Sequence, residues 1–156
     1  MRILIAAVAR KRAGPEDALA QDYIARANAS GRALGFQAID LIDVQGKPPG
    51  DPRAEATALW RATPDNSKRI LLDERGKEWS SRELAQNLAR WRDDGVPCTT
   101  FWIGGPDGAS QTLKDQADEK LAFGRQTWPH LLVRAMISEQ IYRALTILSG
   151  NPYHRD

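Results

Sequence analysis

The sequence has one cysteine and two histidines among its 156 residues, so it is poor in the side chains that build disulfides and most metal centres. The lone cysteine, Cys98, excludes an internal disulfide and a cysteine-rich metal site. His130 and His154 cannot form a zinc site without help from carboxylates, and neither stands in an H-E-x-x-H arrangement. We therefore expect no metal, and the cysteine usage favours a reducing compartment.

Long hydrophobic runs are missing as well. The opening run, Ile3 to Ala9, has seven apolar residues, which is too short for the core of a signal peptide and far too short for a membrane span. We therefore expect a cytoplasmic protein that makes no membrane contact.

The standard signatures of nucleotide binding and of serine hydrolases are absent. No G-x-G-x-x-G follows the first apolar run, and neither G-x-x-x-x-G-K-[ST] nor G-x-S-x-G occurs. The net charge does not indicate a class of binding partner, because 22 basic and 20 acidic residues leave only +2. The basic cluster Arg10 to Arg12 is either a solvated loop or a phosphate contact.

The chain does contain a regular alternation of apolar runs and amphipathic segments. We expect strands at Arg2–Ala9, Phe36–Asp43, Arg69–Glu74 and Cys98–Gly105, with a weaker one at Lys120–Phe123. We expect helices at Pro15–Ala33, Pro52–Ala62, Gln111–Asp118 and Pro129–Leu148, and another after the capping-box pair Ser80 and Glu83. This alternation predicts a single α/β domain over residues 1–156, with a mainly parallel sheet flanked by helices.

Helical spacing predicts which side chains face the core. On the first helix these are Leu19, Tyr23, Ile24 and Ala27; on the helix after Ser80 they are Leu84, Leu88 and Trp91; on the last helix they are Leu132, Met136 and Tyr142. The loop from Gln45 to Pro52 breaks regular structure, and we interpret it as a mobile flap rather than a domain boundary.

Two loops stand where strands of the predicted sheet end, "LDERGK" and "IGGPDG". Ligands of open α/β sheets bind at the carboxyl ends of the strands. Gly104 and Gly105 would let a flat ligand touch the backbone directly, although a glycine pair also makes ordinary tight turns. If a ligand lies there, a valine at Gly105 is expected to fill its pocket.

Polar residues of the last helix and of the chain end allow two interpretations each. His130 begins the helix and is either structural or functional. Arg134 and Arg143 are expected to point in similar directions, on a solvated face, towards phosphate or into a subunit interface. Tyr153 to Arg155 follow "SGNP", so they form either a disordered tail or a group with a chemical role.

Taken together, "LDERGK", "IGGPDG", "PHLLVRAMISEQIYRAL" and "NPYHRD" resemble the RlmH family, the large-subunit rRNA pseudouridine N3-methyltransferases of the SPOUT superfamily. The resemblance covers essentially the whole chain, and the last helix with its "PYHR" tail is its most specific part. It implies an α/β fold with a C-terminal trefoil knot, a homodimer, and a pseudouridine substrate in a 23S rRNA stem-loop at the ribosomal subunit interface.

The resemblance also implies that S-adenosylmethionine binds between three loops. Carried over by position, the binding residues are Leu72 and Asp73, then Gly104 and Gly105, then Gly124, Arg125, Gln126, Thr127, Trp128 and Pro129. The third loop reads "GRQTWP" here and departs from the serine- and leucine-rich pattern of the family. The departure matters little if backbone groups contact the cofactor, and more if a side chain does.

In the tail, the resemblance assigns catalytic roles to His154, Arg155 and Tyr153. His154 is the candidate general base for the ring N3 proton, Arg155 would stabilise an anionic oxygen or a phosphate, and Tyr153 would stack on a base or orient the histidine. Two other interpretations stay open at this stage. The chain is either a SPOUT methyltransferase with another RNA target or a non-catalytic ribosome-binding protein that has kept the fold.

Overall fold

The structure, a computed structural model, describes residues 1–9 and 14–155. Five strands form one sheet in the order β2-β1-β4-β3-β5, and every pairing between them is parallel. The strands are β1 (Arg2–Val8), β2 (Ile39–Val44), β3 (Lys68–Glu78), β4 (Cys98–Ile103) and β5 (Glu119–Ala122). The parallel sheet confirms the expected fold class, and the trefoil knot stays a prediction.

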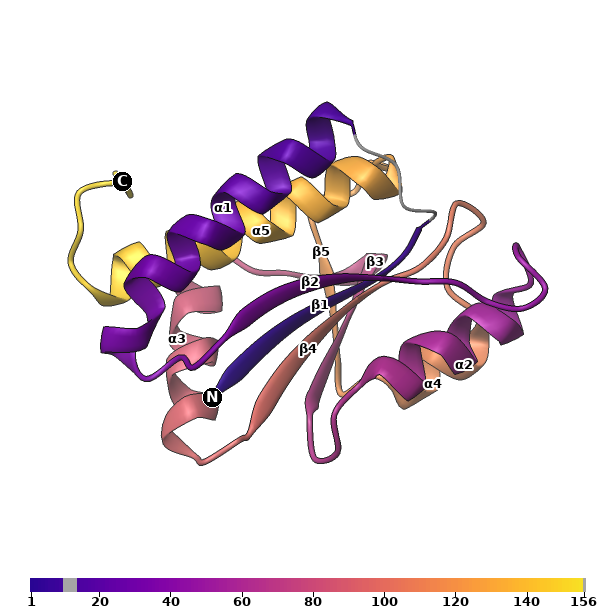
Figure 1. Cartoon of the computed structure of the whole chain (residues 1–156), viewed down its shortest axis with the longest axis horizontal. Coiled ribbons are helices and arrows are strands. Elements are labelled where there is room, and N and C mark those ends of the chain that lie inside the picture. The colour runs from indigo at the N-terminus through magenta and orange to yellow at the C-terminus, as the bar shows by residue number, and fades with distance from the viewer. Residues whose placement is uncertain (10–13, 156) are drawn as a thin grey trace.

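Helices cover both faces of this sheet (Figure 1). The helices are α1 (Pro15–Gly31), α2 (Pro52–Ala62), α3 (Ser81–Asp93), α4 (Gln111–Gln116) and α5 (His130–Leu148), with a short 3-10 helix, η1 (Arg32–Leu34), after α1. On one face α5 packs between α1 and α3, and α2 with α4 covers the other. With both faces covered, every side chain of β4 is buried, as expected for an inner strand of a parallel sheet.

Each face of the sheet has its own apolar core. Phe101 points into the larger core under α1, α3 and α5, and its neighbour Trp102 points into the smaller core under α2 and α4. This alternation follows from the two-residue period of a strand. Cys98, at the start of β4, is buried as expected and stays a free thiol.

Local signals in the sequence set several helix ends. Ser80 accepts a hydrogen bond from the Glu83 amide, and the Glu83 carboxylate accepts one from the Ser80 amide, which confirms the capping box. α3 then buries Leu84, Leu88 and Trp91, as the spacing predicts.

Several boundaries differ from the expectations by one or more residues, and three of these differences have a clear structural cause. β2 begins at Ile39 instead of Phe36, because the Phe36 amide donates to the Gly31 carbonyl and its side chain is buried in the core. α4 ends at Gln116, because Asp118 turns to bind the Arg69 amide and guanidinium. β3 continues to Glu78, because it pairs with β5 a second time after an irregularity between Leu72 and Lys77.

The side chains that the two long helices, α1 and α5, turn towards the core also differ in part from those expected from helical spacing. Leu19 is 45% exposed, whereas Ile24 and Ala27 are buried as expected. On α5 the core side chains are Ile137, Ile141 and Leu145, and Leu132, Met136 and Tyr142 are only half-buried. The expected apolar sides are therefore wrong in part, and an apolar strip of α1 and α5 stays uncovered in a single chain.

Two expectations about loops have no outcome. The cluster Arg10 to Arg12 lies outside the described residues. The flap interpretation of Gln45 to Pro52 stays a prediction; at its start, Gly46 packs so closely on α2 that a Cβ atom would lie 2.6 Å from the Glu55 amide nitrogen.

Candidate functional site

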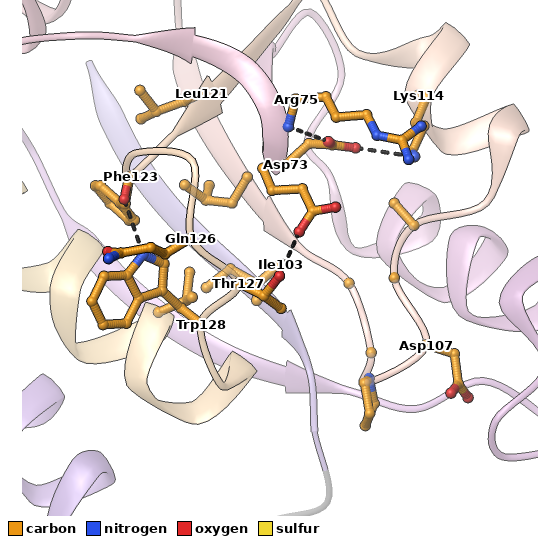
Figure 2. Close-up of a pocket in the computed structure, with 18 of the residues that line it drawn as sticks. Asp73, Arg75, Ile103, Asp107, Lys114, Leu121, Phe123, Gln126, Thr127 and Trp128 are labelled. Atoms are coloured by element: carbon orange, nitrogen blue, oxygen red, sulfur yellow. Dashed lines mark hydrogen bonds and ion pairs between the residues drawn. The ribbon is translucent and has the colours of Figure 1, made fainter.

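Three loops meet at the carboxyl edge of the sheet and enclose a cavity of about 480 Å³ (Figure 2). They follow β3, follow β4 and precede α5, so the first and the last of them are about 50 residues apart in the chain. The irregularity in β3 makes room for the cavity, because residues 73–76 leave the ladder with β5 before pairing resumes at Lys77.

Eight of the ten expected cofactor-binding residues line this cavity. They are Leu72, Asp73, Gly104, Gly105, Gly124, Gln126, Thr127 and Trp128. Arg125 and Pro129 are not among its lining residues, and both are exposed. The sequence analysis missed other residues of the wall, notably Ile103, Lys114 and Phe123. Lys114 comes from α4, whose polar sequence gives no local signal of a site.

Asp73 is the most buried charged group of the cavity, with a side chain only 8% exposed. Its carboxylate accepts a hydrogen bond of 2.8 Å from the Arg75 amide and pairs with Lys114 at 3.2 Å. Burial alone would raise the pKa of Asp73, but the Arg75 amide and Lys114 outweigh it, and the pKa lies below its ordinary value. The cavity therefore offers a fixed carboxylate with a cation beside it at neutral pH.

The loop before α5 is held by its own side chains. Thr127 donates a hydrogen bond of 2.9 Å to the Glu74 carboxylate, which ties this loop to the end of β3. The Trp128 indole donates to the Phe123 carbonyl at 2.9 Å, and its ring is 38% exposed. In this chain the atypical residues of "GRQTWP" thus fix the shape of the loop.

The glycine pair after β4 is required by close packing behind the loop. A Cβ atom on Gly105 would lie 2.7 Å from the Glu55 carboxylate, and one on Gly104 would lie 3.3 Å from the Ala109 amide nitrogen. The expectation that a valine at Gly105 fills the pocket stays a prediction. The side chain would first meet Glu55, on the α2 side of the loop.

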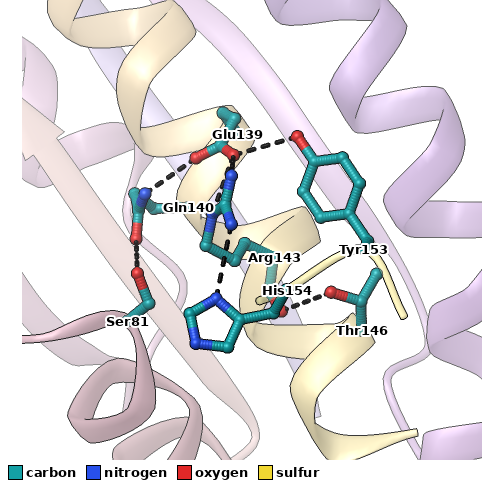
Figure 3. Close-up of polar contacts among 7 residues, drawn as sticks. All are labelled: Ser81, Glu139, Gln140, Arg143, Thr146, Tyr153 and His154. Atoms are coloured by element: carbon teal, nitrogen blue, oxygen red, sulfur yellow. Dashed lines mark hydrogen bonds and ion pairs between the residues drawn. The ribbon is translucent and has the colours of Figure 1, made fainter. Parts of the chain in front are cut away.

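The C-terminal tail is docked on the middle of α5 (Figure 3). The Tyr153 hydroxyl donates to the Glu139 carboxylate at 3.0 Å, and its ring meets Tyr142 edge-on, with centroids 4.8 Å apart. Arg143 lies 4.7 Å from the centre of the Tyr153 ring and 3.3 Å from Nδ1 of His154. Tyr153 and His154 are therefore placed by the Glu139–Arg143 ion pair rather than disordered, and Arg155 is exposed.

The tail and the cavity are not brought together within one chain. The cavity loop ends where α5 begins, at His130, whereas Tyr153 reaches back only as far as Glu139. Nine helical residues separate these two points, which is about 13 Å along the helix axis.

The two arginines of α5 do not point in similar directions. Nine residues advance a helix by two and a half turns, so the side chains lie on opposite sides. Arg134 is 3% exposed and pairs with Asp17 at 3.2 Å and with Asp43 at 2.8 Å, which joins α5 to α1 and β2. The expectation of a solvated face is wrong for Arg134, whose role is structural.

No group of three or more histidine, cysteine, aspartate or glutamate side chains suited to a metal ion occurs in the described part of the chain. Among residues 1–9 and 14–155, no helix is both long and apolar enough to cross a membrane.

Comparisons with known proteins agree with this architecture. The family model described as "Predicted SPOUT methyltransferase" matches residues 1–154. The chain is 51% identical to the ribosomal RNA large subunit methyltransferase H of Paracoccus denitrificans over 156 residues, which is 100% of both chains. It is 48% identical to the protein of that name from Cereibacter sphaeroides over 155 residues, or 99% of each.

Among solved structures, the chain is similar to the SpoU methyltransferase AviRb from Streptomyces viridochromogenes, crystallised in complex with AdoMet. The TM-score is 0.43 at 15% identity, covering 96% of this chain and 61% of the other. The assignment of the chain to a family therefore rests on the full-length match to the family model and on the near-50% identity to curated relatives. The chain is a SPOUT methyltransferase and belongs to the family of the large-subunit rRNA methyltransferase H proteins.

Proposed function

We propose that this enzyme transfers a methyl group from S-adenosylmethionine to N3 of a pseudouridine in a 23S rRNA stem-loop at the ribosomal subunit interface. The main support is the three-loop cavity at the carboxyl edge of the sheet, in a chain that matches its curated relatives over its full length. An rRNA substrate also fits a cytoplasmic location.

The residues of the cavity fit a cofactor that has both an apolar ring system and charged groups. A volume of about 480 Å³ is within the usual range for small-molecule sites. Leu72, Ile103 and the bare backbone of Gly104 would receive the flat adenine ring, and Asp73 with Lys114 offers partners for polar groups. When bound, S-adenosylmethionine supplies an electrophilic methyl group on a sulfonium, so the protein mainly has to align the acceptor and exclude water.

The acceptor nitrogen must lose its proton before it can attack. We assign this step to His154, because an imidazole is the side chain that most often acts as a general base in enzymes. Arg155 is exposed and free to contact the ring oxygen or a phosphate, and Tyr153 packs on Arg143 beside the histidine.

A homodimer would complete the site, with the tail of one chain approaching the cavity of the other. Two observations support this arrangement. The tail lies about 13 Å or more from the start of α5 in its own chain. In addition, Leu19, Leu132 and Met136 line an uncovered apolar hollow of about 260 Å³ between α1 and α5. Two modestly basic chains would together present the rRNA with a larger positive surface.

The direct test is a methylation assay on ribosomes from a strain that lacks the modification, with the product nucleoside identified by mass spectrometry. We expect N3-methylated pseudouridine. A methyl group on another nucleoside would favour the alternative of a different RNA target. Absence of cofactor binding at millimolar S-adenosylmethionine in calorimetry would favour a non-catalytic ribosome-binding protein.

The role of the tail has its own test. We expect His154→Ala to leave cofactor affinity nearly unchanged and to lower methyl transfer by about 100-fold or more, the usual scale for a general base. His130→Ala is not a suitable control, because His130 lies beside the cavity loop; Arg155→Lys keeps the charge and is expected to have a smaller effect. Unchanged turnover in His154→Ala would remove this residue from the role.

A further inference from the structure

A second cavity, of about 370 Å³, lies on the other side of the loop that follows β4. Its wall includes Glu55 from α2 and His130 from α5, together with the backbone of Gly46 and Gly50. Pro106 and Asp107 line both this cavity and the three-loop cavity. The two spaces are therefore neighbours, separated by one short loop.

Glu55 is an unusual residue for the wall of a small protein's cavity. It is 8% exposed, and no cation among the described residues contributes to its pKa. Burial raises the pKa of its carboxyl above the ordinary value, and Asp107 and Asp51 add to this effect. Hydrogen bonds with the amides of Gly105 and Gly50 act against it. Burying a carboxyl group is costly unless cations or hydrogen-bond donors compensate it, and among the described residues only the two glycine amides do so. They leave part of its accepting capacity for a ligand.

His130 adds a polar group to the same wall. It is the first residue of α5 and is half-buried, and in the described part of the chain neither of its ring nitrogens has a hydrogen-bond partner. Burial lowers the pKa of His130, and the nearby Arg134 lowers it further. The ring is therefore neutral at pH 7, with one nitrogen that donates and one that accepts.

We propose that this second cavity receives the base of the target nucleotide and that Glu55 accepts a hydrogen bond from N1–H of pseudouridine. The inference rests on the proposed function. Pseudouridine is attached to its ribose through carbon, so its N1 carries a hydrogen, whereas N1 of uridine is bonded to the ribose. A buried acceptor can therefore distinguish the two bases, and a donating nitrogen of His130 suits a ring carbonyl. N3 stays available to the methyl donor across the shared loop.

The discriminating variant is Glu55→Gln, which keeps the shape and one acceptor oxygen for the two glycine amides. It replaces the other acceptor by an NH₂ group, which opposes N1–H. Removing a negative charge also strengthens attraction to RNA, so Asp65→Asn is the matched control. Asp65 is exposed, lines neither cavity and lies in the loop before β3, at the edge of the sheet opposite the three-loop cavity. Calorimetry with S-adenosylmethionine and thermal unfolding show whether each variant is folded.

Two ribosome preparations serve as substrates, one with pseudouridine at the target position and one from a strain lacking the pseudouridine synthase, with uridine there. We expect Glu55→Gln to lower the ratio of kcat/KM for pseudouridine over uridine by about 10-fold or more, since hydrogen bonds to buried charged groups are among the strong ones. Cofactor affinity stays within about 3-fold of the wild type, and Asp65→Asn keeps the wild-type ratio. An unchanged ratio in Glu55→Gln overturns the inference. A wild-type protein that binds the cofactor and methylates neither preparation overturns the proposed function instead.

A second measurement does not depend on turnover. The chain has only two histidines, so its imidazole proton signals in NMR spectra reduce to two sets, and His130→Gln assigns them. We expect millimolar pseudouridine nucleoside, added to protein saturated with S-adenosylhomocysteine, to shift the His130 signals more than uridine does. A shift of the His154 signals alone, or no shift, contradicts the placement of the base.

Discussion

Gly105 gives the sharpest structural prediction, because its replacement by alanine should disturb the loop after β4 from the side that faces α2. An added Cβ atom would lie 2.7 Å from one oxygen of the Glu55 carboxylate and 2.9 Å from the other. Ordinary contacts between such atoms are near 3.5 Å, so the buried Glu55 side chain, the loop or α2 must move by roughly 0.8 Å. Overpacking of this kind costs about 1–3 kcal/mol.

We expect Gly105→Ala to weaken S-adenosylmethionine binding by about 10-fold, since a shifted backbone no longer fits a ligand that contacts it directly. Gly104→Ala is a control for the stability of the loop only, because Gly104 itself lines the cofactor cavity. Its Cβ atom would lie 3.3 Å from the Ala109 amide nitrogen, which a movement of a few tenths of an ångström relieves. Calorimetric titration with the cofactor measures both variants, and thermal unfolding reports whether they are folded.

A double-mutant cycle isolates the cause. The loss of affinity caused by alanine at Gly105 should be smaller when Glu55 is also alanine, because the carboxylate that it meets is gone. An equal loss in both backgrounds would refute the reasoning, as would wild-type affinity in Gly105→Ala.

Three further predictions concern stability, assembly and the tail. Asp118→Asn should lower the free energy of unfolding by about 1 kcal/mol at pH 7. Burial raises the pKa of Asp118, but Arg69 outweighs burial and holds this pKa below 3.8. The stabilising contribution of the carboxylate is therefore present above that pH and disappears as the pH falls through the folded-state pKa, and urea unfolding at neutral and acid pH measures it. Met136→Asp should convert the proposed dimer to monomers in analytical ultracentrifugation, because it places a charge in the uncovered hollow of α1 and α5. A dimer that persists would place the interface elsewhere. Glu139→Gln should make the tail more accessible to carboxypeptidase, since it weakens the acceptor shared by Tyr153 and Arg143; unchanged protection would mean that ring packing alone places the tail.

The sheet was predictable because its signals are local. An apolar run such as Ile3 to Ala9 must be covered on both faces, and the Ser80–Glu83 pair marks a helix start wherever it occurs. The meeting of the two glycine-containing loops at one cavity was predictable, because carboxyl ends of parallel strands meet at one edge. The strand extension beyond Glu74 was not, because "DERGK" is polar and shows its pairing with β5 only in three dimensions.

The charged residues of the interior depend on distant partners, so their local sequence says little. Arg134 is buried because Asp17 and Asp43 meet it from segments 117 and 91 residues away, and helical position alone suggested a solvated side chain. Glu55 lies on α2, and only the folded structure shows that its carboxylate lies against the loop at Gly105. In the proposed dimer the tail meets the cavity of a second chain, and no pattern within one sequence indicates such a contact.

The most direct test of the central claim is a single-turnover methylation assay with the chain ended at Gly150, which deletes Asn151 to Asp156. The cavity loops are intact in this protein, so we predict cofactor affinity close to that of the full chain and methyl transfer to pseudouridine-containing ribosomes reduced by about 100-fold or more. Transfer at the full rate by the shortened chain would contradict a site completed by the tail.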